Sequence, residues 1–162
     1  MPEQLRNVHS SLTLELASRI VDEAIAAGRR EKLLPLAVAV LDAGANLVAC
    51  KRDDGCGVLR TAIAEGKAAA ALGMGMPTRQ IRDRLANRPA FQSALAACAD
   101  GRFIPTPGGV LILDQHGNAI GAVGISGDAS DKDEYCAIEA VRRAGLAADP
   151  AEPNPQWQSA GL

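Results

Sequence analysis

The chain has 162 residues, which is the size of one domain with a core large enough to stabilise itself. Its formal net charge is −2, 48% of its residues are hydrophobic and only 2% are aromatic, so the composition argues against a disordered chain, a nucleic-acid-binding face and an aromatic-lined pocket. No stretch has the pattern of an export signal or a membrane span, and we therefore expect a cytoplasmic protein.

The first predicted element is an amphipathic helix near the start of the chain. Apolar residues recur every fourth position after Ser11 and Thr13, and either of these two side chains can cap the first turn. The apolar pattern stops between Gly28 and Pro35, where we expect the helix to end.

Two β-hairpins with the same sequence pattern follow, one over residues 36–50 and the other over 110–125. In each, two short apolar runs flank a polar turn that begins with an aspartate, Asp42 or Asp114, and ends with an asparagine four residues later. Short polar side chains can bond the turn backbone and tolerate left-handed geometry, which favours a turn at both places.

Four further segments have helical patterns. Thr78 and Asn87 are the expected caps of the second and third, and Gly145 is the expected stop of the last. The segments are 59–74, 79–86, 88–99 and 133–144.

Because helices alternate with hairpins, the sequence predicts an α+β sandwich in which both hairpins form one antiparallel sheet covered by helices. We expect a single domain over residues 1–146 and a proline-containing tail over 147–162. The tail holds Trp157, which either hangs free or anchors onto the body or onto a neighbouring subunit.

The first candidate site is the charged turn that follows the first hairpin. Arg52 has a planar guanidinium that can bind a carboxylate or phosphate through two hydrogen bonds, with Lys51 beside it as a second cation. Asp54 can hold the turn or the arginine in place. The alternative is an ordinary solvated loop.

The second candidate is Lys67, a long cation on a helix face made of very small residues. Such a side chain either extends along the surface to solvent or points into a cleft. In a cleft, loss of hydration would lower its pKa and make it a candidate acid, base or anion ligand.

Two glycine-containing segments are the third candidate. Gly108 and Gly109 allow a ligand or another backbone to approach closely, and the backbone amides near Ser126 and Gly127 could hold a ligand carboxylate. Just beyond them, Ser130 and Asp133 have the spacing of a helix-capping pair, so we expect the neighbouring acids to be structural.

Histidine and cysteine offer little for a metal site. His9 lies before the first helix and His116 lies in a hairpin turn, and neither has zinc-finger spacing to the cysteines. The cysteines have no C-x-x-C pair, so we expect free thiols that serve as small apolar side chains. They are Cys50, Cys56, Cys98 and Cys136.

Several stretches together resemble the GlcG/HbpS family, a haem-degrading domain that also occurs as the C-terminal domain of PduO-type proteins. The resemblance implies a profilin-like sandwich that assembles into symmetric oligomers, with ligand sites in or near the subunit interfaces. We expect the alanine-rich helix face over 62–71 to take part in that packing. The matching stretches are 38–48, 52–55, 67–68, 73–78, 107–110 and 121–127.

The resemblance favours a small-ligand-binding protein that takes haem or a related tetrapyrrole as its cofactor. Lys51 stands where family members often carry His or Glu, which leaves His9 as the candidate imidazole ligand, reached from the leader or from a neighbouring subunit.

Two alternative functions stay open. One is a cofactor-free lyase or isomerase of a small carboxylated or aromatic metabolite, with Arg52 as anion clamp and Lys67 as acid or base. The other is a non-catalytic assembly or sensor protein. In each case the expected partners are a small molecule and further copies of the chain, and neither nucleic acid nor a membrane.

Overall fold

The two predicted hairpins lie side by side in one antiparallel sheet. The computed structural model describes residues 4–162, and the order of its strands across the sheet is β2-β1-β4-β3-β5, with every neighbouring pair antiparallel. The two hairpins therefore join through β1 and β4, which confirms the predicted α+β fold. The strands are β1 (Ala37–Asp42), β2 (Leu47–Arg52), β3 (Gly109–Leu113), β4 (Ala119–Ser126) and β5 (Ala147–Asp149).

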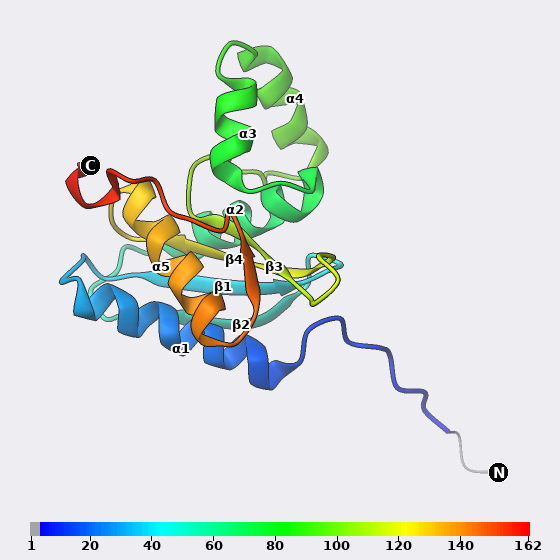
Figure 1. Ribbon diagram of the computed structural model, residues 1–162. Coiled ribbons are helices and arrows are strands. Elements are labelled where there is room, and N and C mark those ends of the chain that lie inside the picture. The colour runs from blue at the N-terminus through cyan, green and yellow to red at the C-terminus, as the bar shows by residue number, and fades with distance from the viewer. Residues whose placement is uncertain (1–3) are drawn as a thin grey trace.

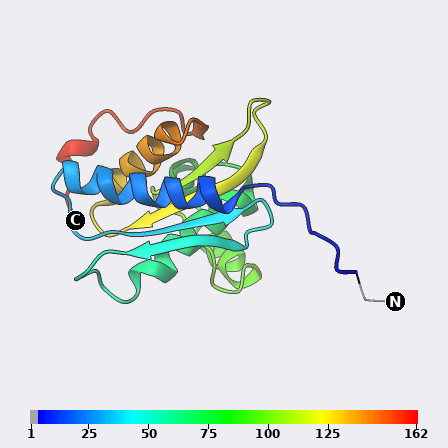
Figure 2. The ribbon, with the colours of Figure 1, turned by 90° about the horizontal axis from the view of Figure 1, so that it is seen from below.

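Helices cover both faces of the sheet (Figures 1 and 2). The α-helices are α1 (Leu14–Arg30), α2 (Arg60–Met74), α3 (Thr78–Leu85), α4 (Pro89–Cys98) and α5 (Ser130–Arg143). The main core lies between the sheet and the pair α1 and α5, and α2 covers the opposite face. The pair α3 and α4 projects from the α2 side (Figure 1). No helix among residues 4–162 combines the length and the apolar character that crossing a bilayer requires.

Polar side chains fix the ends of the first elements. Thr13 caps α1 by accepting a hydrogen bond from the Leu16 amide at 3.2 Å. Ser11, the other candidate cap, instead accepts from the amide of Ala43 at 2.9 Å, which holds the leader beside the turn between β1 and β2. The helix ends at Arg30, within the predicted interval.

The aspartates organise both hairpin turns. Oδ1 of Asp42 accepts hydrogen bonds from two amides of its turn, each at 2.9 Å, and Oδ1 of Asp114 does the same at 2.8 and 2.9 Å. The left-handed positions are Ala45 and Gly117, each one residue before the asparagine, so the asparagines do not supply that geometry.

The predicted caps of the later helices are wrong. The N-cap residues of α3, α4 and α5 make no capping hydrogen bond through a side chain. Helix α5 begins at Ser130, three residues earlier than predicted. Thr78 lies inside the first turn of α3, where its Oγ1 accepts from the Gly109 amide at 2.9 Å. Asn87 precedes the residue at the N-cap of α4. The Thr78 side chain is used instead in a tertiary contact, which local spacing does not reveal.

Small residues let α2 lie directly on the sheet. Ala64, Ala68 and Ala71 are fully buried against it, and a Cβ on Gly124 of β4 would collide with the backbone of Ala64. This corrects the expectation for the alanine-rich face, because that face packs within the chain and is closed to other subunits.

The C-terminal segment is partly built into the fold. Its first three residues form β5, which pairs with β3 and was not predicted from the sequence. Further on, the ring of Trp157 stacks on that of Tyr135 in α5, with centroids 3.7 Å apart and planes 7° from parallel. Trp157 therefore anchors the C-terminal segment onto the body of the same chain.

Candidate functional site

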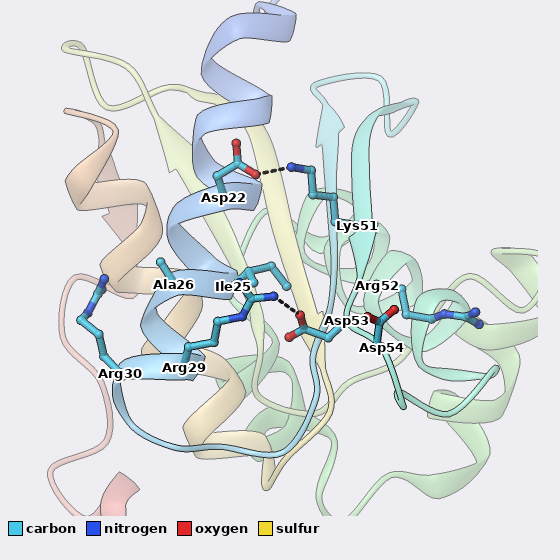
Figure 3. Close-up of a pocket in the computed structure, with 9 residues that line it drawn as sticks. All are labelled: Asp22, Ile25, Ala26, Arg29, Arg30, Lys51, Arg52, Asp53 and Asp54. Atoms are coloured by element: carbon cyan, nitrogen blue, oxygen red, sulfur yellow. Dashed lines mark hydrogen bonds and ion pairs between the residues drawn. The ribbon is translucent and has the colours of Figure 1, made fainter.

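The charged turn after β2 divides its two cations between the two faces of the sheet. Lys51 lies opposite Val38 and Arg52 lies opposite Ala37, and successive residues of a strand point to opposite faces. Lys51 is on the α1 face, where its Nζ is 2.5 Å from Oδ1 of Asp22. In Figure 3 the side chain of Arg52 extends away from α1. The two cations therefore do not converge on one ligand within the chain.

A groove with a volume of about 620 Å³ runs between α1 and the end of β2 (Figure 3). Two ion pairs bridge it, Lys51 to Asp22 and Arg29 to Asp53, the latter at 2.8 Å. Lys51 and Asp22 are both about 60% exposed, so their pair contributes less than about 1 kcal/mol. These pairs neutralise Arg29 and Lys51, whereas Arg30 and Arg52, which also line the groove, have no ion pair with the residues that the structure describes.

Asp53, and not Asp54, holds the turn in place. The amide of Asp53 donates to the carbonyl of Leu36 at 2.8 Å, and its carboxylate accepts from the Leu36 amide at 3.4 Å. Asp54 is exposed and makes no hydrogen bond or ion pair with the residues that the structure describes.

Arginines gather on the opposite face, at the same end of the sheet. Arg52, Ala37 and Ser126 form one row across β2, β1 and β4, and their side chains point toward the α2 side. Nη1 of Arg60, at the start of α2, donates to Oγ of Ser126 at 3.2 Å. Burial raises the pKa of the nearby Cys56 thiol, while the positive charges of Arg60 and Arg52 lower it in part.

This end of the sheet also exposes apolar side chains. Val58 is 82% exposed and Leu59 is 69% exposed, in the loop that leads into α2. We use the name arginine rim for the surface made by these two residues with Arg52, Cys56 and Arg60. Within residues 4–162 the guanidinium of Arg52 has no ion-pair partner, so it is available to an external anion.

Lys67 is buried beneath the loops at this end. Its Nζ donates to the carbonyl of Ile125 at 2.8 Å and to Oδ2 of Asp133 at 3.0 Å. Burial lowers the pKa of Lys67, an effect that Asp133 opposes, and burial likewise raises the pKa of Asp133 to about 6. Lys67 therefore neither reaches solvent nor faces a cleft.

The glycine segments serve this internal packing. Gly108 has a left-handed φ of +119°, and a Cβ there would lie 2.9 Å from Nζ of Lys67. A Cβ on Gly109 would meet the backbone of Lys67, and one on Gly127 would meet the backbone of Pro35. The sequence allowed either a ligand or another backbone to approach these glycines closely. In the structure it is another backbone.

The backbone near Gly127 does bind a carboxylate, but it is the protein's own. Oδ1 of Asp133 accepts from the Asp128 amide at 3.1 Å. Asp133 is therefore not a cap for Ser130, and the predicted pairing of these two residues is wrong. A lone cation among alanines needs a counter-charge, and this requirement was the one sequence signal that could have pointed to a buried acid.

Glu134 is a second buried acid, and the sequence pattern does not distinguish it from the neighbouring acids of the first turn. Its carboxylate is fully buried, 3.1 Å from Nη1 of Arg79 in α3. Burial raises the pKa of Glu134 to about 7, although Arg79 opposes the shift.

Neither histidine lies near the arginine rim of the same chain. Ser11 fixes the leader, and with it the nearby His9, at the turn between β1 and β2. Arg52 is at the far end of β2, about 17 Å away at ~3.3 Å per residue. His116 is exposed in the turn between β3 and β4, at the opposite end of β3 from Gly109. An imidazole could reach the rim only from another copy of the chain.

The sequence model of one known family matches most of the chain. The sequence model of the family described as "Haem degrading protein HbpS-like" matches residues 12–142. No curated protein matches the chain.

Solved structures share the fold over nearly the whole chain. The structure of HbpS is 27% identical with a TM-score of 0.70, covering 87% of this chain and 94% of HbpS. The PduOC:heme complex is 21% identical with a TM-score of 0.74, covering 84% and 96%, and ORFY of Klebsiella pneumoniae is 24% identical with a TM-score of 0.73, covering 90% and 97%.

Proposed function

Because the chain belongs to the family of HbpS-like haem degrading proteins, we propose that it binds haem or a related tetrapyrrole at the arginine rim. The family match supports the ligand class. The choice of surface rests on the side chains that are free to bind it.

One observation carries the assignment to the rim, namely that unpaired cationic and exposed apolar side chains occur there together. Haem has two carboxylates on one edge of a flat apolar ring. Arg52 and Arg60 offer planar donors that match carboxylates, and Val58 and Leu59 offer apolar contact beside them. The groove between α1 and β2 lacks this combination, because its apolar lining consists only of Ala26 and the buried Ile25, and two of its cations are already ion-paired.

The rim also fits an iron ligand, though with a cost. Cys56 lies in the rim, and cysteine thiolate is an established axial ligand of haem iron. The raised pKa of this thiol means that ligation would require loss of a proton, at about 1.36 kcal/mol for each unit between the pKa and the ambient pH. The imidazole of His9 from a second copy is the alternative ligand. Lys51 faces the other side of the sheet and does not take part.

The lyase or isomerase hypothesis gains no support from this geometry. Its proposed acid or base, Lys67, is 2% exposed and bonded to Asp133 and to the Ile125 carbonyl. A substrate could reach it only if the glycine segments moved away from α2.

Haem titration of the purified protein tests the proposal. We expect wild type to give a sharp Soret band with a saturable, stoichiometric end point. Arg52→Ala should weaken binding by about 2 kcal/mol, which is roughly 30-fold, whereas Arg19→Ala, an exposed arginine of α1, should leave it unchanged. Equal affinities for the two variants would show that the ligand does not use the rim.

The same titration identifies the iron ligand. If Cys56 ligates, Cys56→Ser should move the Soret band and His9→Ala should not. If His9 of a second copy ligates, the two variants should behave in the opposite way. Variants that both keep the wild-type spectrum would rule out both ligands.

A further inference from the structure

An apolar pocket lies between the end of α2 and α4, in the part of the molecule where α3 and α4 project from the body (Figure 1). Its volume is about 180 Å³, and its walls come from α2, from α4 and from the loop after α4. The pocket is separate from the arginine rim. Gly73 in its wall is 13 residues after Arg60 of the rim, which is about 20 Å along α2 at ~1.5 Å per residue.

A glycine keeps the pocket open at a position where packing within the chain does not require one. Ala69 and Gly73 line the pocket from α2, and residues four apart share one helix face. A Cβ on Gly73 would meet no heavy atom within 4 Å, and its φ is not left-handed. Within a helix glycine is less favourable than alanine. Contacts inside the chain therefore give no reason for Gly73, whereas a ligand seated against α2 would give one.

The walls of the pocket favour an aromatic ring. Met74 and Phe103 lie in the lining, together with Leu95. Sulfur–aromatic and aromatic–aromatic contacts stabilise a ring beyond the apolar area that it buries, and an aliphatic chain gains neither. Because an apolar cavity of about 150 Å³ can hold benzene, the volume found here is that of a single six-membered ring with its substituent.

Arg102 supplies a cation to this pocket. Asp100 and Gly101 are both left-handed, with φ of +55° and +78°, and they turn the chain back after α4 to bring Arg102 into the lining. Its Nη2 donates to the carbonyl of Ala45 at 2.8 Å, which fixes the guanidinium and leaves its other N–H donors free. Among residues 4–162 Arg102 has no ion-pair partner, and no carboxylate lines the pocket. The free donors can therefore bind an external carboxylate.

We propose that this pocket binds a small monocyclic aromatic carboxylate, of which benzoate is the simplest member. The ring lies between α2 and α4 against Met74 and Phe103, and the carboxylate accepts hydrogen bonds from Arg102. A neutral ring would lose the contact with the cation, and a fatty acid would lose the contacts with the sulfur and the ring. The site does not depend on the proposed haem site, because the two share no residue.

Isothermal titration calorimetry of the haem-free protein with benzoate tests the site. We expect saturable binding of one molecule per chain. Benzamide keeps the ring without the charge and should bind roughly tenfold more weakly or worse, and hexanoate keeps the charge without the ring and should also bind more weakly. No saturable binding up to about 10 mM benzoate would overturn the proposal. Hexanoate that binds as tightly as benzoate would overturn it in favour of an aliphatic ligand.

Two variants test the two halves of the pocket separately. Arg102→Gln removes the charge, while its amide can still donate to Ala45, and should weaken benzoate binding roughly tenfold with little effect on benzamide. Arg84→Gln, at an exposed arginine of α3 outside the lining, is the matched control and should bind benzoate as wild type does. Gly73→Leu should fill the pocket and abolish binding of both ligands in a folded protein. Wild-type affinity in Arg102→Gln or in Gly73→Leu would contradict the assignment.

Cys98 reports where benzoate binds. Its thiol is exposed and lines the pocket, whereas Cys56 lies in the arginine rim. Saturating benzoate should slow the alkylation of Cys98 by iodoacetamide several-fold and leave that of Cys56 unchanged, as measured by mass spectrometry of the labelled peptides. Protection of Cys56 in place of Cys98 would show that benzoate binds at the rim and would overturn the assignment to the pocket.

Discussion

Replacement of Lys67 by methionine tests whether this residue is a structural cation. Methionine keeps much of the length of the side chain and removes the charge together with the hydrogen bonds that Nζ donates to the Ile125 carbonyl and to Asp133. The Asp133 carboxylate, which is 1% exposed, would then lose its counter-ion while keeping the amide hydrogen bond from Asp128. Leaving one partner of a buried pair uncompensated costs about 3 to 5 kcal/mol. We expect a loss of this size in the free energy of unfolding, measured by urea denaturation at pH 7.5.

Lys132→Met is the matched control. Lys132 pairs with Asp128 at 3.4 Å and keeps 22% of its side chain exposed, and the Asp128 carboxylate retains hydrogen bonds from the amides of Leu34 and Ala129 without it. We therefore expect a smaller loss, of about 1 kcal/mol. The double variant Lys67→Met with Asp133→Asn should recover part of the loss, since the buried carboxylate is gone and the amide oxygen can still accept a hydrogen bond.

The pH dependence gives a second readout for the same variant. The ammonium of Lys67 lowers the pKa of Asp133, so its removal raises that pKa further above the unfolded value of 3.8. A raised pKa in the folded state means that stability increases as the pH falls. The penalty of Lys67→Met should therefore be smaller at pH 5 than at pH 8. A loss no larger than that of Lys132→Met, at both pH values, would refute the structural role.

Three further predictions concern stability. Burial raises the pKa of Glu134 to about 7 in the folded protein, against 4.5 in the unfolded chain. This group therefore stabilises the folded state below pH 4.5, and about 3 kcal/mol of that stabilisation is lost as the pH rises through 7. Glu134→Gln should flatten this part of the dependence of the unfolding free energy on pH, measured by urea denaturation, and an unchanged profile would contradict the prediction. Trp157→Ala removes the stack on Tyr135 and should lower the free energy of unfolding by about 1 kcal/mol. It should also make the C-terminal segment more sensitive to limited proteolysis. Equal cleavage rates for wild type and the variant would show that the stack does not hold the segment. Gly124→Ala should lower the free energy of unfolding, measured by thermal denaturation, by about 1 to 3 kcal/mol, because the added methyl group meets the Ala64 backbone. Gly73→Ala should raise it by about 0.5 to 1 kcal/mol, because no heavy atom lies within 4 Å of the added methyl group and alanine favours a helix. Similar effects at the two glycines would contradict the packing described for α2.

Local patterns were sufficient for the hairpins and the longer helices. An aspartate that bonds its own turn acts within five residues, and an amphipathic helix repeats its apolar positions, so both leave a signal in a short window. The strand β5 leaves none, because Ala147, Ala148 and Asp149 have neither alternation nor β-branched side chains. It exists because β3 offers a free edge, and that edge is formed only when the sheet assembles.

The candidate site was predicted in parts. Lys67 stood out as a cation on a face of small residues, but its partner Asp133 is 66 residues away and carries the spacing of a helix cap. The sequence pattern places Lys51 and Arg52 in one charged turn, and only the extension of β2 to Arg52 shows that their side chains face opposite ways. The convergence of Arg52 with Arg60 depends on the pairing of three strands, which no local window contains.

The proposal that the arginine rim binds the carboxylates of a tetrapyrrole is tested most directly by comparing haem with its dimethyl ester. Esterification removes both negative charges and leaves the ring and the iron unchanged. Wild type should bind haem at least about 30-fold more tightly than the ester, and the double variant Arg52→Ala with Arg60→Ala should bind both ligands with similar, weak affinity. A wild type that binds the two ligands equally well, or a double variant that keeps the full preference for haem, would contradict the account.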